Sequence, residues 1–362
     1  MVSASLAVAH TSFTLPERLH ATEPPEARGV TRDEVRLLVA RPDKVEHARF
    51  SNLRDHLLPG DLVVVNTSAT LAAAVDGFHS DGRPVTVHFS SPVEPDSWVI
   101  ELRDSNGPLP GAADGDILYL PQGARIDMLA AHPDPELGRS RLWRAHLQVD
   151  LDEEQYLARY GRPITYGYLH GRWPLSDYQT IFGRQQGSAE MPSAGRPFTD
   201  RLVTDLVVRG INVAPVLLHA GVSSLEAGEA PQEERYDVPC STAWLVNETH
   251  EAGGRVIAVG TTVTRALETV ARPDGIVVCG SGRTDLVLGT DRPARAVDGL
   301  ITGWHPPQAS HLSLLEAVAG PKLVQRAYDA AIEAGYLWHE FGDSCLLLPH
   351  SRAAKGYLRK VS

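Results

Sequence analysis

The chain has 362 residues, of which 43% are hydrophobic and 22% are charged, and its formal net charge is −11. This is the composition of an ordinary globular protein, and the length is sufficient for two domains. The acidic balance argues against a general phosphate-backbone binder, because it provides no overall attraction for nucleic acid.

The three cysteines and the N-terminus limit the compartment and the kinds of site. Cys240, Cys279 and Cys345 are far apart and form no CxxC motif, so we expect no disulfide framework and no structural zinc. Neither HExxH nor a Cys/His cluster occurs, and we expect no metal. No apolar run reaches membrane-spanning length and no secretory signal is evident, so we expect a cytoplasmic protein without membrane contact.

The first 74 residues are typical of the start of an α/β domain. Residues 1–28 contain several prolines and are expected to be irregular, whereas residues 34–40 predict a strand. Residues 50–58 suit a short helix. The β-branched run at residues 62–65 predicts a central strand, and it ends in the polar cluster of residues 66–68, where α/β proteins usually bind ligands.

From residue 75 to residue 148 the pattern changes to short strands separated by turns such as Asp81-Gly82 and Asp114-Gly115. This pattern is typical of a small β-barrel. The strands are expected at residues 85–89, 98–102, 117–120 and 142–147. We therefore predict an α/β fold in which residues 1–74 and 149–362 form the catalytic domain and residues 75–148 form an inserted all-β barrel domain.

Alternating helices and strands resume after residue 149. Helices are expected at residues 152–160, 201–209, 243–252, 311–319 and 322–334, and strands at residues 211–218, 276–279, 286–288, 300–302 and 345–348. An aromatic and glycine-rich loop covers residues 166–186. Gly280-Ser281-Gly282 is only half of a dinucleotide fingerprint, and we interpret it as a turn.

Residues 253–270 (GGRVIAVGTTVTRALETV) form a complete strand–turn–helix unit. The strand covers residues 255–259 and ends at Gly260, and Thr261 and Thr262 supply hydroxyls where a helix N-cap is expected. A helix that begins at a strand end suits an anionic ligand, because its first N–H groups are free and its dipole is positive there. The same pattern also fits a βα unit that binds nothing.

Polar residues cluster at the predicted strand ends. They offer a histidine or glutamate base and hydroxyl donors, although their spacing alone names no reaction. These residues are Asn66, His219, Thr261, Thr262, Thr302 and His305, with Glu234 and Asp298 nearby in the sequence.

Across nearly its whole length the chain resembles the S-adenosylmethionine:tRNA ribosyltransferase-isomerase family of queuosine biosynthesis. The matching segments occur in the family's order, and residues 253–262 with Arg265 are the most specific of them. The segments are residues 13–17 (FTLPE), 59–66 (PGDLVVVN), 178–180 (YQT), 192–195 (PSAG), 218–221 (LHAG), 234–236 (ERY), 253–262 (GGRVIAVGTT), 298–302 (DGLIT) with His305, and 341–343 (FGD).

The resemblance implies a large α/β domain with an inserted β-barrel, in agreement with the change of pattern at residues 75–148. It also implies a reaction in which S-adenosylmethionine donates its ribosyl carbons to the amine of 7-aminomethyl-7-deazaguanine in tRNA. Adenine and methionine leave, and the sugar becomes an epoxycyclopentanediol. The partners implied are S-adenosylmethionine as co-substrate and tRNA, and we expect a monomer.

The matching segments also suggest the site residues. We expect Thr261, Thr262 and Arg265 to hold the methionine carboxylate or a phosphate. Candidates for proton transfer are His219, Glu234 and His305, and substrate contacts are expected from Asn66, Ser193, Gly195, Thr199, Gly260, Thr261, Thr262, Arg265, Asp298, Thr302 and Asp343.

Several positions depart from the family pattern. Two family arginines are replaced by Ala69 and Ala74, a histidine by Pro197, and a lysine by Gln308, with Arg196 as a local compensation. Such losses remove contacts that tRNA phosphates or the acceptor base would use. A second function therefore stays open, in which a diverged relative uses a small-molecule acceptor or cleaves the donor without tRNA. A third is an inert binding protein on the same fold.

Overall fold

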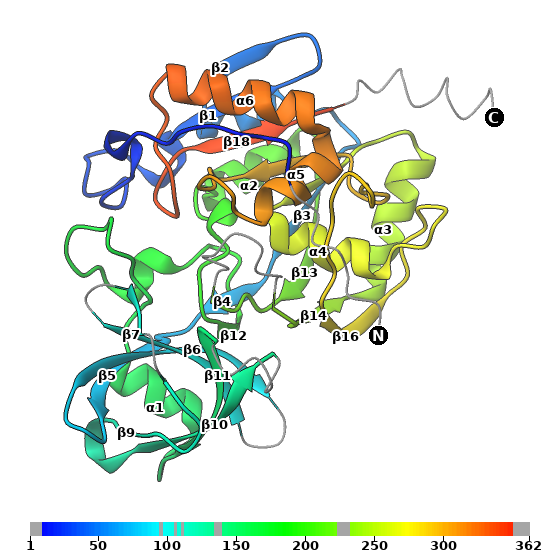
Figure 1. Ribbon diagram of the computed structural model, residues 1–362. Coiled ribbons are helices and arrows are strands. Elements are labelled where there is room, and N and C mark those ends of the chain that lie inside the picture. The colour runs from blue at the N-terminus through cyan, green and yellow to red at the C-terminus, as the bar shows by residue number, and fades with distance from the viewer. Residues whose placement is uncertain are drawn as a thin grey trace.

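The computed structural model describes residues 9–93, 97–104, 107–109, 112–133, 140–222 and 232–349. Two parts are evident in Figure 1: a large sheet covered by helices, and a β-barrel below it. This arrangement confirms the predicted fold class.

Four parallel strands form the centre of the large sheet. The central strand β3 (Leu62–Asn66) lies between β13 (Asn212–Leu218) and β15 (Val256–Val259), and β15 pairs with β17 (Gly299–Thr302). All four were expected from their apolar runs. Because they are parallel, their carboxyl ends meet at one edge of the sheet, where ligands bind in α/β folds.

Five more strands complete this sheet, whose order is β16-β14-β13-β3-β15-β17-β18-β1-β2. The outer strands are β14 (Glu234–Val238), β16 (Gly280–Thr284), β18 (Ser344–Leu347), β1 (Arg36–Ala40) and β2 (Val45–Arg49).

Three predictions around residue 280 are wrong. Residues 276–279 form only an isolated bridge between Ala271 and Val277, and residues 286–288 are not a strand. Gly280-Ser281-Gly282, expected to be a turn, belongs to β16, whose one strand partner among the described residues is β14. An edge strand held by backbone bonds needs little side-chain packing, so apolar character does not locate it.

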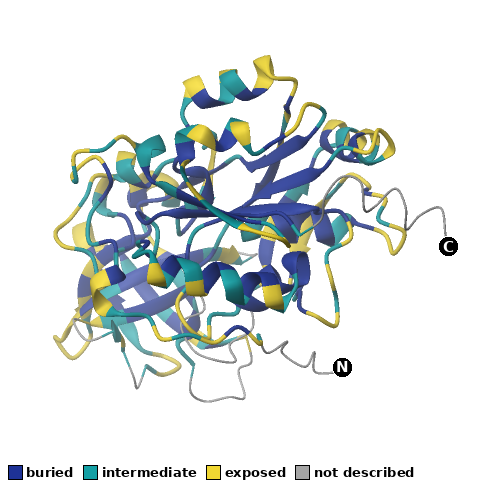
Figure 2. Cartoon of the chain, turned by 90° about the horizontal axis from the view of Figure 1, so that it is seen from above, coloured by how far each residue is buried: buried dark blue, intermediate teal, exposed yellow. Residues whose placement is uncertain are grey.

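Helices cover both faces of the sheet. Alternate residues of β3 face opposite sides: Val63 and Val65 pack in the core with α2, and Leu62 and Val64 pack in the core with α3 to α6. Figure 2 shows the buried sheet between helices whose outer faces are exposed. The α-helices are α1 (Glu153–Tyr160), α2 (Asp200–Val208), α3 (Cys240–Glu251), α4 (Thr261–Val270), α5 (His311–Ala319) and α6 (Pro321–Glu333). The 3-10 helices are Glu17–Leu19, Arg32–Glu34, Phe50–Asp55, Pro121–Gly123, Leu175–Tyr178 and Ser193–Gly195.

The barrel closes because β7 pairs with β11. The ring order is β11-β10-β9-β5-β6-β7, with β7 pairing back to β11 and the short β8 added to β7. Its core also contains Tyr156 and Leu157 of α1. The division at residues 75 and 148 stays a prediction. The strands are β5 (Ala74–His79), β6 (Pro84–Val93), β7 (Ser97–Asp104), β8 (Gly107–Pro108), β9 (Ile117–Tyr119), β10 (Arg125–His132) and β11 (Leu142–Gln148). A separate two-stranded pair joins β4 (Ser68–Thr70) to β12 (Gln185–Ser188).

The expectation that the cysteines form no disulfide is wrong for one pair. Cys240 and Cys279 are joined, with Cα atoms 4.5 Å apart, and Cys345 is buried and free. The pairing of Val238 with Gly280 brings the two cysteines together across a separation of 39 residues, which linear spacing does not reveal. Among the described residues, none of the helices has the length and apolar character that a membrane span requires.

A buried ion pair fixes the start of the central strand. Asp61 is fully buried, and its carboxylate accepts bonds from Arg255 Nε at 3.1 Å and from the Leu58 amide at 2.8 Å. We predict that Asp61→Ala lowers the free energy of unfolding by about 3–5 kcal/mol, because it leaves a buried guanidinium without its partner. Urea denaturation measures this loss. The exposed Asp291→Ala is the control, and equal stability of both variants would contradict the prediction.

Candidate active site

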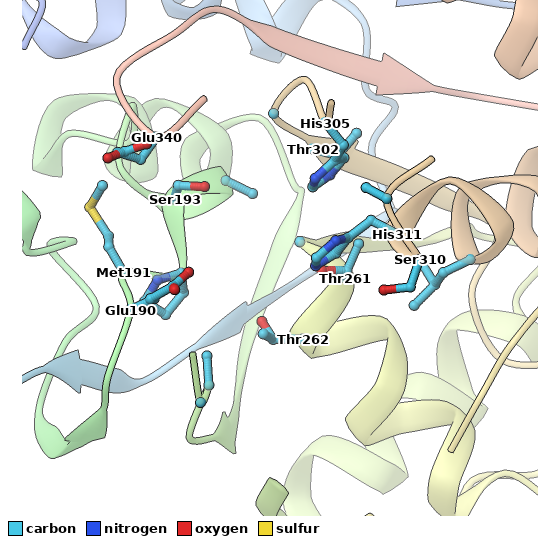
Figure 3. A pocket seen from close by; sticks show the side chains of 18 of the residues that line it. Glu190, Met191, Ser193, Thr261, Thr262, Thr302, His305, Ser310, His311 and Glu340 are labelled. Carbon is cyan, nitrogen blue, oxygen red and sulfur yellow. The ribbon is translucent and has the colours of Figure 1, made fainter. Parts of the chain in front are cut away.

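A cavity of about 390 Å³ lies at the carboxyl ends of the four parallel strands. Its walls come from the residues that follow β13, β15 and β17, from the start of α5, and from loops around residues 166, 190 and 340. Figure 3 shows two groups of polar side chains facing each other across this space. The cavity is large enough for a nucleoside-sized ligand.

The first wall is formed by the N-terminus of α4. Gly260, rather than a threonine, is the N-cap residue, and no side chain caps the helix, so the predicted threonine cap is wrong. Gly260 has a φ of +93°, which a residue with a side chain rarely adopts. The uncapped turn leaves Thr261 and Thr262 on the cavity wall beside backbone N–H groups that have no partner within the helix.

Two stacked histidines stand beside this helix end. The rings of His305 and His311 are 4.5 Å apart and within 4° of parallel, and Thr302 Oγ1 lies 3.0 Å from His305 Nε2. Burial lowers the pKa of His305 well below its usual value, and the neighbouring His311 adds to this effect. Burial also lowers the pKa of His311 to about 4, with a further contribution from Arg265. Both imidazoles are therefore neutral near pH 7.

The opposite wall carries two tyrosine–glutamate pairs. The Tyr168 hydroxyl donates to Glu340 at 2.5 Å, and the Tyr166 hydroxyl donates to Glu190. Burial raises the pKa of Glu340 to about 7, and the nearby Glu190 acts in the same direction. His339 stacks on the Tyr168 ring at 3.9 Å.

Arg265 and Glu234 lie in the cavity wall, where they form an ion pair with each other. Arg265 donates to Glu234, to the Leu286 carbonyl at 3.3 Å and to the Thr284 carbonyl at 3.1 Å. The other carboxylate oxygen of Glu234 accepts from the Gly221 amide at 3.0 Å. These bonds tie α4 to β14 and β16, so both side chains hold the wall in place.

His219 lies behind the wall and is not among the residues that line the cavity. Its Nδ1 is 2.7 Å from Ser68 Oγ, which is 2.6 Å from Ser188 Oγ. Burial lowers the pKa of His219 to about 4, and Arg235 adds to this effect. The ring leaves no space for a side chain at Gly187, where a Cβ would be 2.6 Å from it.

Of the expected residues, the cavity brings together Ser193, Glu234, Gly260, Thr261, Thr262, Arg265, Thr302 and His305. Asn66 is buried beside them and donates to the Leu218 carbonyl at 2.8 Å and to Thr262 Oγ1 at 3.3 Å. It therefore supports a residue of the wall.

The remaining expected residues lie elsewhere. Thr199 caps α2, and its Oγ1 accepts from the Leu202 amide at 3.2 Å. Asp298 precedes β17 at the amino end of the strand, so it lies at the opposite edge of the sheet from Thr302 and bonds the Val256 amide at 2.9 Å. Asp343 accepts from the Arg36 and Leu337 amides, each at 2.8 Å. Gly195 packs against Thr180.

His311, Glu190, Glu340 and the two tyrosines also line the cavity, although their sequence context did not single them out. Tyr166 and Tyr168 fall in the loop identified as aromatic, and Glu340 directly precedes the matching segment at residues 341–343. Nothing in their spacing indicates that the tyrosines pair with glutamates far along the chain. The proposed compensation by Arg196 fails geometrically: this buried side chain pairs with Glu26 at 2.8 Å. Within the described residues no group of three His, Cys, Asp or Glu could hold a metal.

The chain is similar to known proteins over nearly its full length. The family model described as "Queuosine biosynthesis protein" matches residues 8–347. The S-adenosylmethionine:tRNA ribosyltransferase-isomerase of Gloeobacter violaceus is 34% identical, covering 94% of this chain and 96% of the relative. That of Desulforamulus reducens is 33% identical, covering 93% and 98%. A crystal structure of the S-adenosylmethionine tRNA ribosyltransferase from Thermotoga maritima, 27% identical, has a TM-score of 0.52 over 93% of this chain and 99% of that one.

The low pKa of His311 predicts a pH dependence of stability. As the pH falls from about 6.5 toward 4, His311 binds a proton in the unfolded chain but not in the folded protein. The free energy of unfolding therefore falls over this range. His311→Gln should make this fall smaller. Urea denaturation at pH 7 and pH 5 measures it, with the exposed His170→Gln as control. An unchanged slope in His311→Gln would refute this explanation.

Proposed function

Because the chain belongs to the queuosine biosynthesis protein family, we propose that it is an S-adenosylmethionine:tRNA ribosyltransferase-isomerase. It transfers the ribosyl group of S-adenosylmethionine to 7-aminomethyl-7-deazaguanine in tRNA and isomerises it, and adenine and methionine are released. The co-substrate is S-adenosylmethionine, no metal takes part, and the enzyme acts as a cytoplasmic monomer. Catalysis takes place in the α/β domain, with residues 75–148 as the inserted barrel.

The observation that supports this function most directly is the wall formed by α4 and α5. Both helices begin at the cavity, beside Thr261, Thr262 and Ser310. Free N–H groups and positive dipole ends favour an anionic group, and the methionine carboxylate of the donor is such a group. Arg265 is already bonded to Glu234 and to backbone carbonyls, so the helix ends and the hydroxyls bind this carboxylate.

His305 is the proton acceptor in this proposal. The sulfonium acidifies the ribose 5′ carbon, and a neutral imidazole on the cavity wall can take that proton. Because burial lowers the pKa of His305, the protonated ring donates a proton more readily than a free imidazolium and can pass it to the departing adenine. Thr302 Oγ1, 3.0 Å from Nε2, orients the ring.

Glu234 and His219 have positioning roles. Glu234 is bonded to Arg265 and to the Gly221 amide, and protonating it would break the ion pair that ties α4 to β14. His219 bonds Ser68 behind the wall.

One observation favours a small-molecule acceptor instead of tRNA. Ala69 and Ala74, which replace family arginines, are buried, with exposed fractions of 8% and 0%. These positions present no cation to a phosphate backbone.

Adenine release distinguishes these functions. The protein is incubated with S-adenosylmethionine, with and without tRNA that carries 7-aminomethyl-7-deazaguanine. The proposal predicts adenine only with this tRNA. Release that ignores tRNA would support donor cleavage or another acceptor, and no release with tRNA would overturn the proposed activity.

We predict that His305→Gln lowers kcat for adenine release by about 10²–10⁴, the usual contribution of a proton-transfer group. Glutamine keeps a polar group but cannot accept the proton. The exposed His170→Gln should keep the wild-type rate. A His305→Gln variant that folds normally and retains full kcat would remove His305 from the mechanism.

A further inference from the structure

The wall that faces α4 holds one carboxyl group, that of Glu340, with no cationic partner among the described residues. Glu190 and Glu340 both line the cavity, and Figure 3 shows them on the side away from Thr262, His305 and His311. Within the described residues, Glu340 forms no ion pair with a lysine, arginine or histidine. Its neighbour His339 is neutral near pH 7, because burial lowers its pKa to about 4 and His20 adds to this effect.

The two tyrosines hold the carboxylates in position. Tyr168 donates to Oε2 of Glu340 at 2.5 Å, and Tyr166 donates to Oε1 of Glu190. The tyrosine rings stack with centroids 6.0 Å apart, and Arg103 lies over the Tyr166 ring at 5.4 Å. A carboxylate that accepts one hydroxyl bond has further lone pairs for a cationic donor. The wall thus presents carboxylate oxygens, held in place by tyrosine hydroxyls, to a cationic group.

We propose that Glu340, with Glu190 and the two tyrosines, forms the subsite for the primary ammonium group of the acceptor. This inference rests on the proposed function and adds to it the place where the attacking amine binds. The donor's own α-ammonium fits this place less well, since it sits on the carbon that bears the carboxylate. With the carboxylate at α4, that ammonium stays on the α4 side.

The same glutamate activates the amine. The acceptor arrives as R–NH₃⁺, one N–H proton moves to a carboxylate oxygen of Glu340, and an uncharged R–NH₂ with a free lone pair remains beside a neutral carboxylic acid. Burial raises the pKa of Glu340 to about 7, Glu190 raises it further, and the Tyr168 hydrogen bond opposes both. A carboxylate with this pKa exchanges protons readily near neutral pH.

Binding of two free bases tests the subsite without turnover. The probes are 7-aminomethyl-7-deazaguanine, which carries the ammonium, and 7-cyano-7-deazaguanine, which is neutral. Calorimetry with S-adenosylmethionine present should show that the wild-type protein binds the ammonium base more tightly by about tenfold or more. Glu340→Gln should lose that preference and bind S-adenosylmethionine within about twofold of wild type. The exposed Glu333→Gln is the matched control and should behave as wild type.

Two results would overturn the subsite. One is equal binding of both bases by the wild-type protein. The other is weaker binding of S-adenosylmethionine by Glu340→Gln with the base preference intact, which would assign Glu340 to the donor's ammonium. Glu190→Gln, checked for folding by its thermal melt, repeats the test if Glu340→Gln does not fold. With tRNA as acceptor, Glu340→Gln should also change the pH profile of adenine release.

The outcomes separate the subsite from the proposed function. A wild-type protein that prefers the ammonium base but releases no adenine with tRNA would overturn the proposed function and leave the amine subsite standing. The opposite outcome would overturn the subsite alone. In that case adenine release depends on tRNA, but the Glu340→Gln and Glu190→Gln variants keep the preference for the ammonium base.

Discussion

The parallel alignment of β3, β13, β15 and β17 is the constraint on which the site depends. Backbone pairing aligns these strands, so the residues that follow each carboxyl end meet at one edge. Asn66 connects two of these ends to Thr262, and Arg265 ties α4 to the antiparallel strands β14 and β16. Without this alignment, α4, His305 and the loop after β13 would not enclose one cavity.

The two walls of the cavity differ in electrostatic character. Helix ends and hydroxyls on one side favour an anion, and tyrosine-bonded carboxylates on the other favour a cation. A cavity of this kind orients a donor with a carboxylate relative to an acceptor with an amine. In the proposed function, the stacked histidines lie on the side that binds the donor's carboxylate, close to where the donor's ribose would extend.

The sequence locates the cavity residues that follow predicted strands, but it does not locate those that lie in loops. Thr302 and His305 could be predicted because they follow an apolar run. Asp298 precedes the same run, so the direction of the predicted strand already places Asp298 at the opposite edge of the sheet from Thr302. Glu340 and Tyr168 could not be paired from sequence, since 172 residues separate them and only tertiary packing joins them. The Cys240–Cys279 disulfide was missed for the same reason.

A crystal structure of the protein with S-adenosylmethionine bound tests the central claim most directly. The account predicts the methionine carboxylate within hydrogen-bond distance of the α4 amides and of Thr261 or Thr262, and the ribose 5′ carbon beside His305. Glu340 should then contact no atom of the donor. A donor bound in the reverse orientation, with its α-ammonium on Glu340 and its carboxylate away from α4, would contradict the account.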